Sequence, residues 1–168
     1  MPRQIEVATR SDTQPRKRWR RAAELPEEVF AVLRKPNRSI NPVAIVATVN
    51  EDGTPHTAPF GSVRAVTPKL LRLISARYHD TYQNMARDGR VMLAVLAAPD
   101  IAVSIRGRAR VVREQMLAAE ESALVEIDVE EVKNDMVRSG LIESGIGFKP
   151  LAQVQAWFDA VIGEAEEF

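Results

Sequence analysis

The sequence has no cysteine among its 168 residues and only two histidines. The missing thiols exclude a disulfide framework, a thiolate zinc site and a cysteine nucleophile, and they fit a reducing compartment, so we expect a cytoplasmic protein. Two histidines are too few to build a zinc or haem centre from this chain alone. We therefore expect no metal site.

An excess of one charge and long hydrophobic runs are also missing. Lys plus Arg and Asp plus Glu number 23 each, so no net field draws the chain to nucleic acid or to acidic substrates. The apolar runs are only a few residues long, far short of the roughly 20 residues that cross a bilayer, and the polar beginning does not resemble a secretory signal. We expect no membrane span.

The first residues are basic and poor in apolar side chains, which is typical of a segment with little intrinsic order. The stretch "PRKRWRR", Pro15 to Arg21, is either an arm that binds nucleic acid or, as we favour, a solvated tail. We therefore divide the chain into a basic extension, residues 1–24, and one folded domain, residues 25–168. A composition of 45% hydrophobic and 27% charged residues is that of a single domain with a substantial core.

The folded part begins with a helix and a hairpin. A helix is predicted from Pro26, at its first position, to Pro36, which ends it. The β-branched run "VAIVATV", residues 43–49, predicts a strand buried on both faces. "NEDG" then has the residues of a tight turn closed by a left-handed glycine, Gly53, which leads into a strand over residues 54–66.

Alternating and helical patterns continue along the chain. A helix is expected to start at Asp80, capped by that side chain with Gln83 reaching back, and to end at Gly89. Further strands are predicted at residues 70–76, 90–96, 101–112 and 123–132, a brief helical segment at 115–121, a loop at 134–149 and a C-terminal amphipathic helix that carries Leu151, Val154, Trp157, Phe158 and Val161. Six mostly antiparallel strands with flanking helices favour a small, nearly closed barrel.

Two features of the pattern point to a site. Pro55 and Pro59 cannot donate to a ladder, so the strand at 54–66 must have one side open to solvent, a partner or a ligand. Where the strand at 70–76 meets the next helix, unpaired N–H groups would bind an anion, and Ser75, Arg77, His79 and Thr81 can all donate to phosphate oxygens. Without a glycine-rich loop, a mononucleotide phosphate is the better candidate, and an ordinary capped helix start is the alternative.

The stretches "AIVATVNEDGTPHTAPFG", "LLRLISARYHDTYQNMARDGRVMLAVL" and "RGRARVV" resemble the pyridoxamine 5'-phosphate oxidase-like family of FMN-binding split barrels, from about Leu25 to Val132. The resemblance implies a mainly β fold with flanking helices, a six-stranded antiparallel Greek-key split barrel. It also implies a homodimer that holds FMN in two clefts at the subunit interface. The open side of the proline-bearing strand would then face cofactor and partner.

The resemblance also implies which residues bind FMN. Phe60, Gly61 and Ser62 would lie beside the isoalloxazine ring, and Ser75 and Ala76 along the ribityl chain and phosphate. Many members carry a lysine where this chain has Thr81, so Arg77 and Thr81 are expected to hold the phosphate, with His79 as a helper. The candidate cofactor-binding residues are Phe60, Gly61, Ser62, Ser75, Ala76, Arg77, His79, Thr81 and Asn84.

The expected activity is that of an oxidoreductase in which FMN exchanges a hydride or electrons with an unidentified small molecule. His56 is the candidate proton donor, with a half-buried structural histidine as the alternative. The arginine-and-histidine pattern of true pyridoxamine phosphate oxidases is missing near the C-terminus. Alternatives are a non-catalytic flavin carrier or sensor, a deazaflavin or haem in place of FMN, and a nucleic-acid-binding protein that uses its basic arm.

Two further patterns involve packing. Arg106, Arg108 and Arg110 alternate along one strand, and the acidic residues at 126, 128 and 130 alternate along a later one, which predicts a cross-strand charge ladder. Trp157 and Phe158 are expected to pack in the core or at the dimer interface.

Overall fold

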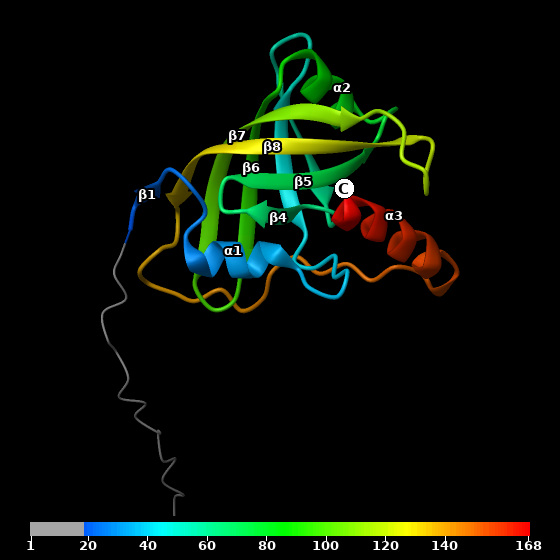
Figure 1. Cartoon of the computed structure of the whole chain (residues 1–168). Helices are drawn as coiled ribbons and strands as arrows, with labels where there is room; N and C mark the ends of the chain where they lie inside the picture. The colour runs from blue at the N-terminus through cyan, green and yellow to red at the C-terminus, as the bar shows by residue number, and fades with distance from the viewer. Residues whose placement is uncertain (1–18) are drawn as a thin grey trace, which may run out of the picture.

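The computed structural model describes residues 19–168 and contains one curved antiparallel sheet with three helices around it (Figure 1). The strands are β1 (Arg21–Ala22), β2 (Ala44–Val49), β3 (Pro55–Phe60), β4 (Arg64–Thr67), β5 (Leu70–Ala76), β6 (Arg90–Ala97), β7 (Ile101–Arg113) and β8 (Ser122–Asn134). The helices are α1 (Glu27–Arg34), α2 (Asp80–Arg87) and α3 (Gln155–Glu167), with a short 3-10 turn, η1 (Ala152–Val154). None of the helices in residues 19–168 has the length and apolar character needed to cross a membrane.

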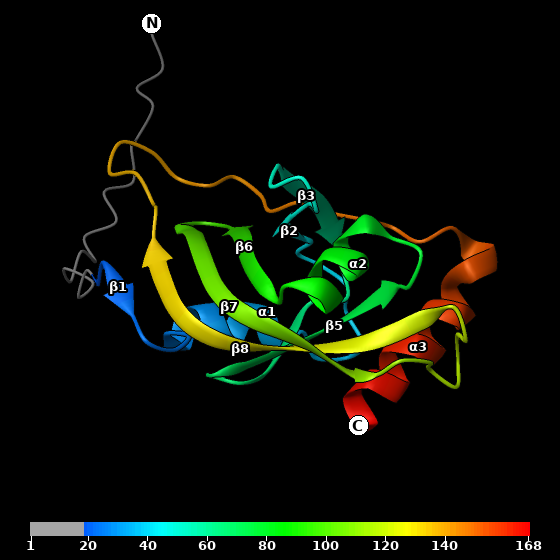
Figure 2. The same cartoon turned by 90° about the horizontal axis from the view of Figure 1, so that it is seen from above.

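The sheet runs in the order β3-β2-β6-β7-β8-β5-β4, and β1 pairs with the end of β8. All pairings are antiparallel, and the long strands β7 and β8 curve so that the sheet wraps into a barrel (Figure 2). The two ends of the sheet, β3 and β4, follow each other in sequence but do not pair. The barrel is therefore split between them, and the expected mainly β split-barrel fold is confirmed.

The strand expected at residues 54–66 is two strands, because the chain turns at Gly61 and Ser62. The Ser62 hydroxyl donates to the Ile74 carbonyl at 3.1 Å and accepts from the Ile74 N–H at 3.0 Å, so a side chain takes the place of a ladder partner. A Cβ on Gly61 would lie 3.1 Å from the Ile40 carbonyl oxygen, which explains the glycine at this close approach. With this break and the short β1, the sheet has eight strands rather than six.

The two prolines lie on an edge strand. Pro55 and Pro59 pair with Val49 and Ile45 of β2, and β3 has no second neighbour within the described part of the chain. One side of β3 is therefore open, as the two prolines predict. The preceding strand, β2, is fully buried on one face and half-buried on the other, rather than buried on both.

Figure 1 shows α1 and α2 at opposite ends of the barrel. Pro26 is the N-cap residue of α1, so the helix begins one residue later than expected, at Glu27. Val29 and Leu33 of this helix are fully buried in the main core. The predicted capping box of α2 is wrong: His79 is the N-cap residue, and the Gln83 amide donates to the Arg77 carbonyl at 2.6 Å. The expected end of α2 is confirmed by Gly89, whose φ is 76°.

The segment at residues 115–121 is a turn rather than a helix, closed by a hydrogen bond of 2.9 Å from the Met116 N–H to the Ser122 carbonyl. Met116 has 1% exposure because it packs in a second core cluster with Leu124 and with Val161 and Ala165 of α3. One side chain thus anchors the turn and the last helix to the sheet. The loop expected at 134–149 contains one isolated bridge, from Val43 to Ile146.

The predicted charge ladder is present on the outer face of β7 and β8. Arg108 pairs in register with Asp128, and Arg110 with Glu126, which has only 6% exposure. Glu126 also accepts from Arg72 of β5 at 2.9 Å, so this one carboxylate joins three strands. Gly107, next to Arg108 in β7, has no room for a side chain, because a Cβ there would lie 2.6 Å from the Asp128 carbonyl oxygen.

Candidate functional site

A cleft of about 280 Å³ lies at the split of the barrel. Its walls come from the β3–β4 turn, the end of β5, the start of β8, and the C-terminal segment. The lining residues that carry the argument below are Phe60, Gly61, Ser62, Ala76, Trp157 and Phe158. Most of the lining is apolar, so the cleft suits the flat face of a ring.

Four of the sequence-predicted site residues line this cleft: Phe60, Gly61, Ser62 and Ala76. Phe60 ends β3 and is buried, with 7% exposure. Ser62 is fixed by its two hydrogen bonds to Ile74, another lining residue. The β3–β4 turn therefore presents a backbone segment to the cleft in one conformation.

The other predicted residues surround the start of α2, outside the lining of the cleft. Ser75 is buried, and its hydroxyl makes one long hydrogen bond of 3.4 Å to the Ala76 carbonyl. His79 is exposed, and its ring lies edge-on to Tyr78 at 5.4 Å between centroids. The Asn84 amide donates to Thr48 of β2 at 3.0 Å and to Asn50, just after β2, at 2.9 Å.

Two buried polar atoms in residues 19–168 have no hydrogen-bond partner, and both belong to predicted phosphate ligands. They are Nε of Arg77 and Oγ1 of Thr81. The Arg77 guanidinium is held by Nη2, which donates to the Glu120 carbonyl at 3.0 Å. Because an unpaired buried donor costs about 1–3 kcal/mol, two of them at one helix start indicate a place for an acceptor.

His56, the candidate proton donor, is half-buried in β3 opposite Thr48. It shares a face with Ala58 and Phe60 but does not line the cleft. Its register partner Thr48 accepts a hydrogen bond from Asn84 of α2, so His56 lies beside a residue that contacts α2.

Two buried cations lie beneath the β3–β4 turn, and the sequence did not reveal them. Lys35, the C-cap residue of α1, has 2% exposure and donates to the Gly61 carbonyl at 3.0 Å. Arg64 has 4% exposure, pairs with Glu166 of α3 and donates to the Ser39 carbonyl at 3.0 Å. Burial, and then the charge of Arg64, lower the pKa of Lys35 from 10.5 to about 7. No apolar periodicity marks Lys35 as interior, so pattern reading missed it.

The C-terminal segment forms the opposite wall. Trp157 and Phe158 pack edge-on with ring centroids 5.0 Å apart, and both line the cleft. Trp157 is 41% exposed, so it does not pack in the core, and its expected place at a dimer interface stays a prediction. One side chain of α3, Glu164, holds the helix against β7 and the turn that follows it. Glu164 accepts from Arg113 at 2.6 Å and from the N–H groups of Leu117 and Ala118 at 2.8 and 2.7 Å.

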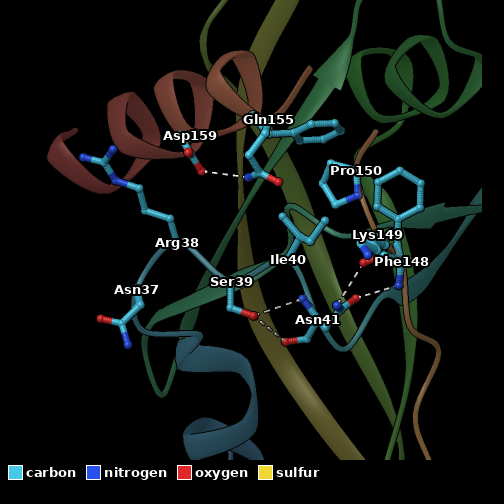
Figure 3. A pocket seen from close by; sticks show the side chains of 11 residues that line it. Asn37, Arg38, Ser39, Ile40, Asn41, Phe148, Lys149, Pro150, Gln155 and Asp159 are labelled. Carbon is cyan, nitrogen blue, oxygen red and sulfur yellow. Dashed lines mark hydrogen bonds between the residues drawn. The ribbon is translucent and has the colours of Figure 1, made fainter. Parts of the chain in front are cut away.

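A second cavity, of about 490 Å³, adjoins the cleft across Ile40, Phe148 and Phe158 (Figure 3). Several of its polar side chains already have hydrogen-bond partners: Asn41 bonds to the backbone N–H and carbonyl of Phe148 at 2.8 and 3.0 Å, and Gln155 donates to Asp159 at 3.1 Å. The apolar cleft is therefore the better candidate site. No group of three metal-ligating side chains occurs in residues 19–168.

An antiparallel barrel, split between its edge strands and with an apolar cleft at the split, defines the class of split-barrel proteins. The chain belongs to the pyridoxamine 5'-phosphate oxidase family, whose model matches residues 25–138. The family assignment made from the sequence motifs is confirmed. The residues beyond 138, which include the aromatic wall of the cleft, lie outside this match.

Solved structures with the same fold include a candidate pyridoxamine 5'-phosphate oxidase from Lactobacillus delbrueckii, which is 25% identical with a TM-score of 0.55 and covers 68% of this chain and 98% of its own. HupZ from Group A Streptococcus is 20% identical with a TM-score of 0.53 and covers 73% and 99%. An F420 reductase is 15% identical with a TM-score of 0.53 and covers 66% and 100%. A comparison with curated proteins found no match.

Proposed function

We propose that this protein is an FMN-binding oxidoreductase that exchanges a hydride or electrons with a small molecule. The observation that supports this proposal most directly is a pair of buried donors without partners, Arg77 Nε and Thr81 Oγ1, near an apolar cleft that could hold a ring. Family membership supports a flavin as the cofactor.

The residues present fit FMN in two places. The cleft between Phe60 and Trp157 would hold the ring, and Arg77 with the N–H groups at the start of α2 would hold the phosphate. Thr81 has 0% exposure, so its hydroxyl reaches a phosphate only if the turn before α2 moves. When bound, FMN supplies the redox chemistry, while the chain binds the ring, excludes water and orients the substrate.

We propose that the functional unit is a homodimer. Around the cleft, Ile146, Phe148 and Trp157 are 40%, 49% and 41% exposed in the single chain, which is unusual for large apolar side chains so close together. A second copy over this face would cover them and complete the site. His56, on the open edge strand, is the proposed proton donor to a substrate that enters there.

The experiment below also tests two alternative functions. A carrier or sensor would bind FMN without turnover. A nucleic-acid-binding protein would use "PRKRWRR", of which residues 15–18 lie outside the described part of the chain. The lack of cysteine supports a reducing compartment, and we propose the cytoplasm.

The test is an FMN titration of the full chain followed by absorbance, with gel filtration to measure bound flavin and oligomeric state. We expect one FMN per chain in a dimer and at least tenfold weaker binding in an Arg77→Ala/Thr81→Val double variant. Arg34→Ala, an exposed arginine on α1, is the matched control. NADH and NADPH reduction then separates enzyme from carrier. Absence of FMN binding at micromolar concentration would refute the proposal, and binding to nucleic acid that falls with salt would support the alternative.

A further inference from the structure

The cleft has a buried amine behind its backbone wall. The Lys35 ammonium donates to the carbonyls of Gly61 at 3.0 Å and Ile40 at 3.5 Å, and both of these residues line the cleft. No carboxylate pairs with Lys35 in residues 19–168. The charged group that influences it is another cation, Arg64 of β4, which is itself paired with Glu166 of α3.

An amine in this place is costly. A buried cation without a counter-ion loses its hydration, and two carbonyl oxygens replace only part of it. The side chain therefore titrates near neutral pH, with a pKa of about 7. A methionine of similar length would fill the same space without this cost, so packing alone does not account for the lysine.

The contact with Gly61 fixes the direction of one peptide group. In a trans peptide the C=O of one residue and the N–H of the next point in opposite directions. Because the Gly61 carbonyl points to Lys35, the Ser62 N–H points away from Lys35. Both Gly61 and Ser62 line the cleft.

We propose that Lys35 is a positioning residue of the cleft: by holding the Gly61 carbonyl it presents the Ser62 N–H to the bound ring, and its charge favours the more negative redox form of that ring. The inference rests on the proposed FMN site and adds to it a residue that controls the balance between the two redox forms.

The charge gives the inference a pH dependence. Below pH 7 Lys35 is protonated and favours added negative charge in the cleft, and above pH 7 this preference fades. Arg64, the other charged group that acts on Lys35, is held in an ion pair with Glu166 of α3. A difference in pH profile between wild type and a Lys35 variant therefore reports on Lys35.

The experiment measures the Kd of FMN and of dithionite-reduced FMN, from pH 6 to 9, for wild type, Lys35→Met and Lys35→Gln. We expect wild type to prefer reduced over oxidised FMN about tenfold more strongly than Lys35→Met at pH 6, with the difference shrinking by pH 9. Lys35→Gln keeps a donor for the Gly61 carbonyl, so it should bind oxidised FMN as wild type does. Because glutamine does not ionise, its preference for reduced over oxidised FMN should lack the pH dependence that Lys35 gives to wild type. Lys69→Met, at an exposed turn lysine, is the control.

The outcomes separate the two proposals. If wild type binds FMN and Lys35→Met shows the same preference and the same pH profile, the role of Lys35 is refuted while the FMN site stands. If Lys35→Met does not fold, Lys35→Gln alone decides, since an unchanged pH profile in that variant overturns the inference. If wild type binds no FMN, both proposals fail.

Discussion

Replacing Lys35 by methionine should stabilise the apoprotein at acid pH and cease to do so in alkali. In the folded protein the pKa of Lys35 is lowered from 10.5 to about 7, first by burial and then by Arg64. Below pH 7 the amine is charged in both states, so the whole cost of burying it is present. As pH rises from 7 towards 10.5 the unfolded chain binds more protons than the folded one, so wild-type stability rises.

The magnitude follows from the pKa. A change from 10.5 to about 7 corresponds to a cost of about 5 kcal/mol at pH 6, falling to about 2 kcal/mol at pH 9. Methionine removes this cost but leaves the Gly61 and Ile40 carbonyls without their donor, a loss of about 3 kcal/mol in total. Lys35→Met should therefore be more stable than wild type by about 2 kcal/mol at pH 6 and no more stable at pH 9.

Urea unfolding of the flavin-free proteins at pH 6, 7, 8 and 9, followed by circular dichroism, measures this difference. Lys69→Met removes an exposed lysine and should leave the free energy of unfolding unchanged within about 0.5 kcal/mol at every pH. The reasoning would be refuted if Lys35→Met were less stable than wild type at pH 6. It would also be refuted if the two free energies of unfolding differed by the same amount at all four pH values.

Three other predictions test the scaffold by urea unfolding. Gly107→Ala should cost about 3 kcal/mol or more, because its Cβ would lie 2.6 Å from the Asp128 carbonyl oxygen; a loss below 1 kcal/mol would contradict the packing. Glu126→Ala should cost about 3 kcal/mol because it leaves buried charge unpaired, whereas Glu130→Ala, on the exposed part of the ladder, should cost about 0.5 kcal/mol; equal losses would refute this. Glu164→Gln should cost about 2 kcal/mol at pH 7. Although burial raises the pKa of Glu164, hydrogen bonds from two N–H groups and an arginine lower it overall, so the loss should shrink as pH falls below 4.5; a constant loss would contradict this.

Most strands could be predicted from the sequence because their side chains alternate. The alternation on β7 and β8 predicted the inward face and a charge ladder between these strands, in which the structure pairs Arg108 with Asp128. The break in the strand at 54–66 could not be predicted, since it depends on Ser62 bonding to Ile74, a residue 12 positions away. The turn at 115–121 was mistaken for a helix because Met116 is held by the packing of α3 rather than by local preference.

The candidate site was predictable only where its residues are contiguous in the sequence. Phe60, Gly61 and Ser62 were implied by the family resemblance of one contiguous motif, and the structure puts all three in the lining of one cleft. Lys35 and the aromatic wall at Trp157 come from segments that tertiary packing brings to the motif. A lone lysine after a helix carries no pattern, and the helical spacing around Trp157 favoured packing in the core or at a dimer interface over a place in a site.

The position of β8 has a consequence for how the chain folds. This last strand pairs with β7 on one side and β5 on the other, so it alone joins β3-β2-β6-β7 to β5-β4. On a ribosome, both groups of strands emerge before residues 122–134 can connect them. The barrel should therefore form late and in one cooperative step, on the millisecond-to-second timescale typical of β proteins whose pairings span long loops.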